Sequence, residues 1–170
     1  YERGAEDNPN QRHGAWIDRV AVIPADEPVA RFGFDTDSWP EDWETSYDEP
    51  NSSVVGDGGY TGGPGLRTGE LDQDGKAVMS LRRDNCPAGK VCFRYRVASE
   101  SADRLSFAVG DDEQAQWQGA TGWRSAAFDI PAGDHLFVWE YTRGGEDDAA
   151  EHAAAIDDIV IVPSDADEPI

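Results

Sequence analysis

Apolar and polar residues alternate along several stretches of the chain, and this alternation constrains the fold more than any other feature. It is clearest at residues 91–97, where Val91, Phe93, Tyr95 and Val97 alternate with Cys92, Arg94 and Arg96. A period of two residues is typical of a β-strand that buries one face and leaves the other in water. The pattern recurs at 105–109, 125–130 and 135–141, with turn residues between these segments. From Arg31 to Val162 the sequence therefore predicts an all-β sandwich.

Aromatic residues lie at strand spacing in the segment 135–141. Phe137, Trp139 and Tyr141 share one face there, and the preceding residues 131–134 read as a turn. Aromatic side chains at this spacing are more often part of a core than of a binding platform. We expect these three side chains in the core.

The net charge excludes several classes of partner. The chain has 35 Asp and Glu against 14 Lys and Arg, a formal charge of −21 at pH 7. Nucleic acids and anionic lipid surfaces are bound mainly through Lys and Arg, so neither is an expected partner. No apolar run approaches the roughly 20 residues that cross a bilayer, and no charged-then-apolar leader follows Tyr1. We expect a folded, soluble, exported domain whose signal sequence has been removed, located extracellularly or at the cell surface.

Nearly all of the basic residues are arginines, because Lys76 and Lys90 are the only lysines. Dense carboxylates with few ammonium side chains suit high salt, where screening relieves self-repulsion. This favours a halophilic origin. A GC-rich genome that replaces Lys with Arg explains the same composition, and the sequence leaves both explanations open.

The chain repeats its own end. Residues 1–7 (YERGAED) match residues 141–147 (YTRGGED), and residues 15–24 (AWIDRVAVIP) match residues 154–163 (AAIDDIVIVP), with one single-residue gap between the two blocks. The residues that follow the second block also recur, because ADEP at 25–28 is repeated at 166–169. The offset of about 140 residues is the size of one domain.

The repeat divides the chain into three parts. Residues 1–28 duplicate the terminal strand of the unit, residues 29–165 form one β-sandwich unit, and residues 166–170 begin a linker. Either the first part closes a preceding copy in a tandem array, which we favour, or it is donated to the sheet of a neighbouring subunit. In both cases the expected partners are copies of the chain itself.

A long segment rich in glycine and aspartate spans residues 46–74. Glycine allows tight turns, and a long loop held by a rigid sandwich is a common place for binding. A plain crossover between the two sheets explains the segment equally well.

Two cysteines, Cys86 and Cys92, flank a turn-like Pro-Ala-Gly sequence. If the turn joins the two strands of a hairpin, the cysteines lie within disulfide reach. Two cysteines in an exported chain favour such a bridge, and reduced buried thiols are the alternative.

Several short motifs together resemble the MAM domain family. They are Phe34-Asp35, Cys92-Phe93-Arg94-Tyr95, Leu105-Ser106-Phe107, Trp117, Gly122-Trp123, Gly133-Asp134-His135 and Ala155-Ile156-Asp157-Asp158-Ile159. The last motif is the most specific. The resemblance covers most of residues 31–162 and implies a two-sheet jelly-roll β-sandwich, MAM-like or concanavalin-like, from an extracellular protein.

The resemblance also implies a structural calcium ion between the first and last strands of the sandwich. Asp35 and Asp158 match the family positions, and Asp37 and Asp57 are looser candidates. Ca²⁺ takes six to eight oxygen ligands at about 2.3 to 2.6 Å, a demand that carboxylates can meet.

An EF-hand-like opening occurs at residues 70–75, but its twelfth position is Leu81, which cannot ligate calcium. We expect a plain turn at Asp74-Gly75.

The sequence contains no recognisable catalytic signature. The chain has three histidines, His13, His135 and His152, and His13 and His152 occupy corresponding positions of the repeat. It has no nucleophile elbow, zinc-binding helix or phosphate-binding loop. We expect no enzyme activity.

Two functional hypotheses remain. The first is a non-catalytic structural or adhesive repeat module that assembles in series with copies of itself into a filament on a cell surface. The alternative is a carbohydrate-binding module of a secreted protein, in which Trp39 and Trp43 contact the glycan.

Overall fold

A computed structural model describes the central unit of the chain. The described residues are 30–32, 43–47, 52–55, 59–60, 63, 65–69, 71–98, 102–144 and 152–164, and those of 30–55 are described by their backbone alone. Residues 1–28 and 166–170, together with the candidate site residues Asp35, Asp37, Trp39 and Asp57, lie outside this set.

The described residues form eleven β-strands and no helix. The strands are β1 (Ala30–Phe32), β2 (Trp43–Tyr47), β3 (Ser52–Val55), β4 (Gly65–Thr68), β5 (Lys76–Cys86), β6 (Gly89–Ala98), β7 (Arg104–Val109), β8 (Asp112–Gln118), β9 (Arg124–Ile130), β10 (Gly133–Thr142) and β11 (Ala153–Pro163). Among these residues no helix is long and apolar enough to span a membrane.

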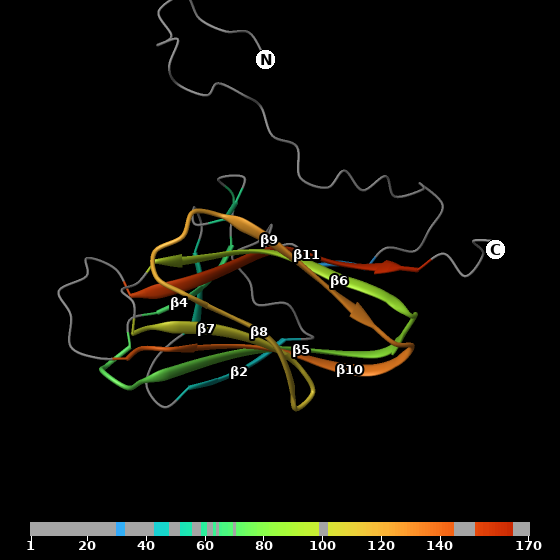
Figure 1. The fold of residues 1–170 in the computed structure, drawn as a ribbon, viewed down its shortest axis with the longest axis horizontal. Coiled ribbons are helices and arrows are strands. Elements are labelled where there is room, and N and C mark those ends of the chain that lie inside the picture. The colour runs from blue at the N-terminus through green and yellow to red at the C-terminus, as the bar shows by residue number, and fades with distance from the viewer. Residues whose placement is uncertain are drawn as a thin grey trace, which may run out of the picture.

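The strands pair into two antiparallel sheets that lie face to face (Figure 1). The first sheet has the order β3-β4-β11-β6-β9, with β1 also paired to β11, and the second has the order β2-β5-β10-β7-β8. The predicted all-β jelly-roll sandwich is confirmed. Each sheet mixes strands from distant parts of the sequence, so the sandwich brings together loops that are far apart in the chain.

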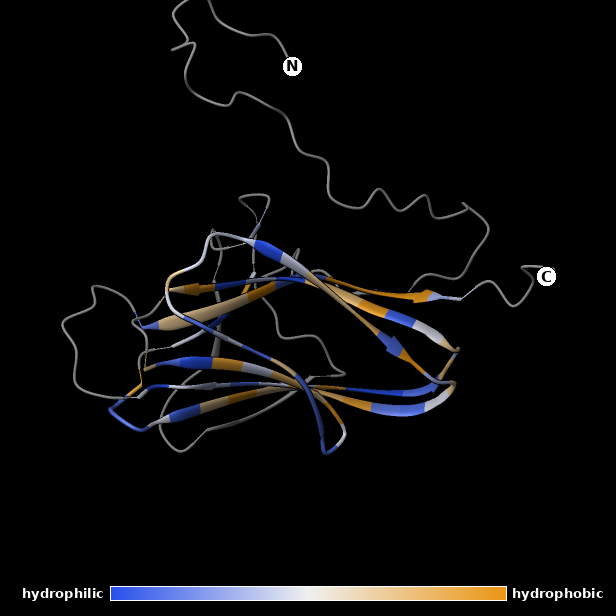
Figure 2. Cartoon of the chain, viewed as in Figure 1, coloured by the Kyte–Doolittle hydropathy of each residue, from blue (hydrophilic) through white to orange (hydrophobic). Residues whose placement is uncertain are grey.

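Alternation along the strands builds the core (Figure 2). In β6, Val91, Phe93, Tyr95 and Val97 are buried while the residues between them are only partly covered. Across the sandwich Phe137, Trp139 and Tyr141 of β10 are fully buried, as predicted. The Phe93 ring lies 5.3 Å from the Trp139 ring, edge to face, so the two sheets interlock through aromatic side chains.

Tyr95 belongs to the same core. Its ring stacks on Trp117 at a centroid distance of 4.1 Å, and its side chain is almost completely buried. Burial raises the pKa of the Tyr95 hydroxyl above its ordinary value, and the nearby Arg124 guanidinium offsets part of that rise.

The prediction of a hairpin and a disulfide at Cys86 and Cys92 is wrong. β5 belongs to the second sheet and β6 to the first, so the turn between them crosses from one sheet to the other. Cys86 is buried at the end of β5, whereas Cys92 lies on the outer face of β6, between Val160 and Ala127 of the neighbouring strands. The two cysteines are not joined by a disulfide bond.

Burial raises the pKa of the Cys86 thiol, and the nearby Arg83 partly lowers it. The Cys86 side chain is therefore a neutral, buried part of the core near neutral pH.

The expected turn at Asp74-Gly75 is confirmed. The Gly75 amide donates to the Asp72 carbonyl at 2.9 Å, and Asp74 adopts a φ of 62°. This tight turn leads directly into β5.

Candidate functional site

The outer face of the first sheet carries basic side chains in an acidic chain. The polar positions of β6 are Lys90, Cys92, Arg94 and Arg96, which alternate with the buried core residues. Arg94 is paired in register with Asp157 of β11 on one side and with Ser125 of β9 on the other. The middle of this face is therefore formed by side chains from three adjacent strands.

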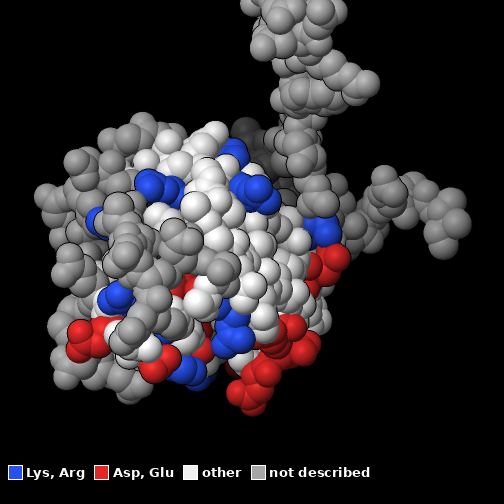
Figure 3. All heavy atoms as spheres, turned by 60° about the vertical axis from the view of Figure 1, so that its left-hand side comes forward, with Lys and Arg blue, Asp and Glu red and all other residues white. Residues whose placement is uncertain are grey.

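Acidic side chains are unevenly distributed over the face that Figure 3 shows. Lys and Arg are spread over the face, including its upper part, where the first sheet lies, whereas Asp and Glu gather along the lower part. Basic side chains therefore lie close to the first sheet, although the whole chain has a net charge of −21.

An aromatic and a guanidinium group stack on this face. Tyr60, in the loop before β4, is 42% exposed, the one large hydrophobic side chain classed as exposed among the described residues. The Arg94 Cζ atom lies 4.2 Å from the centroid of the Tyr60 ring, a cation–π distance. The Trp123 ring meets Tyr60 edge to face at 6.0 Å. We call Tyr60, Arg94 and Trp123 the aromatic–arginine cluster.

Hydrogen bonds hold Arg94 and Tyr60 in place. Arg94 Nη1 donates to Ser125 Oγ at 2.7 Å, and the Tyr60 backbone amide donates to Asp157 Oδ2 at 2.8 Å. Asp157 is only 5% exposed, so the loop that carries Tyr60 is tied to a buried carboxylate of the sheet. Hydrogen bonds to the sheet therefore fix the positions of Tyr60 and Arg94 in the cluster.

A bulge in β11 places Asp157 for this contact. The register shifts between Asp157 and Val160, and Asp158 adopts a φ of 50°, in the left-handed region. The Asp158 amide donates back to Asp157 Oδ1 at 2.7 Å. A bulge of this kind redirects a side chain next to a functional surface.

Of the four candidate calcium ligands, the structure describes only one. Asp158 is exposed at the bulge, and Asp35, Asp37 and Asp57 lie outside the described residues. Within the part of the chain that the structure describes, no group of three or more His, Cys, Asp or Glu side chains is arranged to hold a metal ion. Calcium binding stays a prediction from the sequence.

Of the two tryptophans predicted to contact a glycan, the structure describes only one, and that one by its backbone alone. Trp43 is the first residue of β2, where it is paired in register with Leu81, a core residue of β5. Trp39 lies outside the described residues. Their role in binding stays a prediction.

Sequence reasoning missed the aromatic–arginine cluster, although two signals for it exist. Tyr60 stands among glycines in the segment already considered for binding, and Trp123 follows Gly122 in a short connection before β9. Both are aromatic residues in loops rather than at alternating strand positions, which points to the surface instead of the core.

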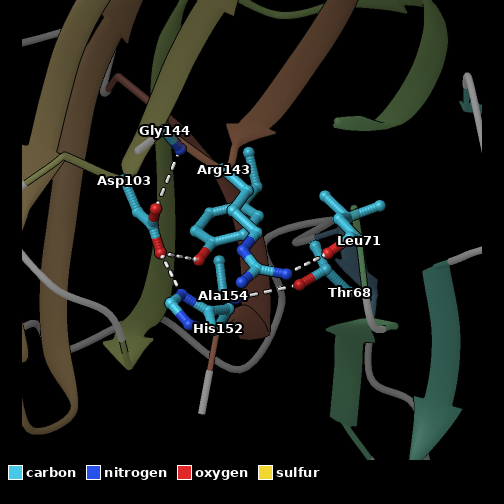
Figure 4. A network of polar contacts seen from close by, with 8 residues as sticks. Thr68, Leu71, Asp103, Arg143, Gly144, His152 and Ala154 are labelled. Carbon is cyan, nitrogen blue, oxygen red and sulfur yellow. Dashed lines mark hydrogen bonds and ion pairs between the residues drawn. The ribbon is translucent and has the colours of Figure 1, made fainter. Parts of the chain in front are cut away.

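A second polar cluster lies at one end of the sandwich (Figure 4). Asp103 is fully buried and accepts three hydrogen bonds, from the Tyr141 hydroxyl at 2.7 Å, from the Gly144 amide at 2.9 Å and from His152 Nδ1 at 2.8 Å. We call these four residues the Asp103 network. It joins the start of β7 to the end of β10 and to the residue before β11.

Two more contacts reinforce the same end of the sandwich. Arg143 Nη1 donates to the Leu71 carbonyl at 2.6 Å, and the Ala154 amide donates to Thr68 Oγ1 at 2.9 Å (Figure 4). A His–carboxylate pair also occurs in catalytic triads, where it activates a nucleophile. Here the carboxylate is shared with a tyrosine and a backbone amide, an arrangement that stabilises the joint between strands.

Comparisons with known proteins support the fold. A scan of protein-family models and a search of curated protein sequences give no match to this chain. Among solved structures, TmCBM61 in complex with β-1,4-galactotriose is similar with a TM-score of 0.60 at 17% identity, over 78% of this chain and 94% of that chain. The K3 cleaved adhesin domain of Lys-gingipain from Porphyromonas gingivalis gives a TM-score of 0.54 at 14% identity, over 72% and 92%.

The secreted serine protease VesC from Vibrio cholerae is also similar, with a TM-score of 0.57 at 24% identity over 70% of this chain. The similar region is 24% of the VesC chain, so this chain spans about a quarter of that protein. At these identities the likeness shows a shared fold, and the finer resemblance to the MAM family stays a prediction from the sequence. The chain is similar in fold to β-sandwich domains of carbohydrate-binding and adhesin proteins.

Proposed function

We propose that this chain is a non-catalytic carbohydrate-binding module of a secreted or cell-surface protein, and that the aromatic–arginine cluster contacts the glycan. The observation that carries the proposal is the exposed Tyr60 ring, which contacts both the Arg94 guanidinium and the Trp123 ring. The C–H faces of a pyranose ring pack on aromatic rings, and its hydroxyls accept hydrogen bonds from a guanidinium.

The support under the cluster favours binding over accidental exposure. The buried Asp157 and the Ser125 hydroxyl fix Tyr60 and Arg94 before any ligand arrives. Groups that are already in place lose little conformational entropy when a ligand binds. The similarity in fold to a module solved with β-1,4-galactotriose supports the same ligand class.

Glycan binding by the full chain tests the proposal. A glycan array identifies a ligand, and calorimetry then compares the wild type with Tyr60→Ala and Arg94→Ala. We expect each variant to bind about tenfold more weakly, corresponding to about 1.4 kcal/mol. The matched control is Arg82→Ala, which removes an exposed arginine of β5 in the other sheet. Silence on the array, or equal affinity in all four proteins, contradicts the proposal.

The duplication of the chain end favours a second candidate, an adhesive or structural repeat module that assembles in series with copies of itself. Electron microscopy of the native full-length protein should then show a periodic string. Isolated monodisperse monomers of that protein contradict this candidate. A structural calcium ion at Asp35, Asp37, Asp57 and Asp158 belongs to the same proposal, and a thermal midpoint that rises with added Ca²⁺ and falls with a chelator would support it.

A further inference from the structure

The duplicated segment repeats the residues with which the end of the unit docks onto the rest of the sandwich. Residues 141–163 close the unit, because they complete β10, join the Asp103 network and form β11 between β4 and β6. We call residues 141–163 the closing segment. Residues 1–24 are its sequence duplicate, with one single-residue gap.

The polar docking residues all recur in the duplicate. Tyr141 and His152, which bond Asp103, correspond to Tyr1 and His13, and Arg143, which bonds the Leu71 carbonyl, corresponds to Arg3. These contacts are made by side chains, so they depend on residue identity.

Gly144 shows why an unremarkable residue also recurs, as Gly4. A Cβ atom at Gly144 would lie 2.5 Å from the Ala102 carbonyl oxygen, so only glycine brings its amide to Asp103. The recurrence therefore follows a steric requirement of this docking site.

The strand itself recurs in the same way. Its inward side chains, Ala154, Ile156, Ile159 and Ile161, are buried, and the duplicate has Ala15, Ile17, Val20 and Val22 at these places. The buried Asp157 at the bulge is matched by Asp18.

The two copies differ at exposed and at buried positions. The exposed Asp158 becomes Arg19, and the buried Ala155 becomes the larger Trp16. The four inward positions stay apolar in both copies, with valine in place of isoleucine at two of them, so the inward face of both segments suits the same site.

The receiving groups, in contrast, occur once in the chain. Thr68, Leu71 and Asp103 lie in the middle of the unit, and the duplicated stretch contains no second set of them. The closing segment of the unit itself already contacts all three (Figure 4). A second closing segment therefore needs the receiving groups of another unit.

We infer that residues 1–24 are a closing segment for a second copy of this unit, in which they form the strand between β4 and β6 and complete the Asp103 network. The partner is thus a chain, or a neighbouring repeat, with the same Thr68, Leu71 and Asp103 groups. This inference does not depend on glycan binding.

Complementation between full-length chains tests the inference. In the acceptor chain, Ile17→Asp and Ile156→Asp together place a carboxylate on the inward face of both closing segments, so neither can dock. The donor is the wild-type chain with an affinity tag. After joint refolding from urea, we expect the donor to retain the acceptor in a one-to-one complex with the circular dichroism of a folded β-protein.

The matched control donor carries Ile17→Asp alone, which leaves its own closing segment intact. It should retain no acceptor above background, at least tenfold less than the wild-type donor. If the wild-type donor retains no more acceptor than this control, the inference is overturned.

A second measurement does not require two chains to meet. The Ile156→Asp chain keeps an intact residue 1–24 segment that can replace its damaged strand, whereas the doubly substituted chain has none. We expect a cooperative urea transition for the single variant and none for the double variant. Two equally unfolded chains would overturn the assignment of residues 1–24 as a closing segment.

Discussion

At the residue scale, Asp103 is a buried carboxyl group that links three segments at one end of the sandwich. Its carboxylate accepts three hydrogen bonds and is fully buried, so its removal takes one buried hydrogen bond each from the Tyr141 hydroxyl, the Gly144 amide and His152. Leaving buried polar groups unsatisfied costs more than the bonds contribute when made.

We therefore predict that Asp103→Ala lowers the free energy of unfolding by roughly 3 kcal/mol. His152→Ala, which removes one partner and leaves Asp103 two donors, should cost about 1 kcal/mol. Urea denaturation measures both values. The control is Asp111→Ala in the exposed β7–β8 turn, expected to stay within about 0.5 kcal/mol of wild type. Equal effects of Asp103→Ala and Asp111→Ala would refute a structural role for the network.

Tyr95 gives the fold a dependence on alkaline pH. Because burial raises its pKa above the ordinary value, the folded chain retains the hydroxyl proton at a pH where the unfolded chain has lost it. Its contribution to stability is complete below about pH 10 and declines as the pH rises toward the folded-state pKa. The buried Cys86 thiol adds a decline of the same sign from its lower ordinary pKa.

Thermal unfolding of wild type and Tyr95→Phe between pH 7 and pH 11 tests this expectation. At neutral pH we expect the variant to be slightly less stable, because it loses the hydroxyl contact with Arg124. The difference in midpoint should shrink or reverse above about pH 10. A constant difference across the whole range would show that Tyr95 does not carry the alkaline sensitivity.

At the element scale, the β5–β6 connection determines how the two sheets are joined. Gly89 begins β6 directly after this crossing, and a Cβ atom there would lie 2.1 Å from the Val162 carbonyl oxygen of β11. That contact is with backbone of a paired strand, which can move only if the β6–β11 pairing is disrupted.

We predict that Gly89→Ala destabilises the unit by about 2 kcal/mol or more, the scale of overpacking against atoms that cannot yield. Gly122→Ala is the matched control, because nothing lies within 4 Å of its Cβ position. Urea unfolding of the two variants compares their midpoints, which report stability when the free energy of unfolding falls with urea at the same slope in both. If both substitutions have the same small effect, the close approach of β6 and β11 does not limit stability there.

How far the sequence predicts the structure also depends on the element. The alternation at 91–97 and 135–141 is a local property, and it assigned both strands and their buried faces correctly. The Pro-Ala-Gly turn after Cys86 has the same local chemistry in a hairpin as in a crossing between sheets, so the turn alone does not identify the partner strand.

The candidate site escaped prediction for a related reason. Tyr60 and Asp157 are separated by 97 positions in the sequence, and Arg94 and Ser125 by 31. Only the pairing of β6 with β9 and β11 brings these residues together, and no local pattern encodes that pairing. The motif at 155–159 nevertheless contains Asp157, the carboxylate that supports Tyr60, next to Asp158, the residue that was predicted as a calcium ligand.

At the scale of the whole molecule, the charge of −21 is the dominant property. Carboxylates confined to a folded unit repel one another more than in the expanded unfolded chain, so low ionic strength should destabilise the fold. The repulsion acts over about 10 Å at 0.1 M salt and about 3 Å at 1 M. If residues 1–24 also join copies together, the repulsion adds up along the assembly.

We therefore predict that the thermal midpoint rises with NaCl, most steeply below about 0.5 M, where the screening length changes fastest. KCl should act equally, because screening depends on ionic strength and not on the cation, whereas sucrose at matched osmolality should not reproduce the steep early rise. Scanning calorimetry of the full chain in the three solutes separates these cases. A midpoint that is flat in NaCl would favour a GC-rich genome over a saline habitat as the source of the Arg-rich, Lys-poor composition. A response to Ca²⁺ at millimolar concentrations, far below those of NaCl, would instead indicate a bound ion at the carboxylates of the first and last strands.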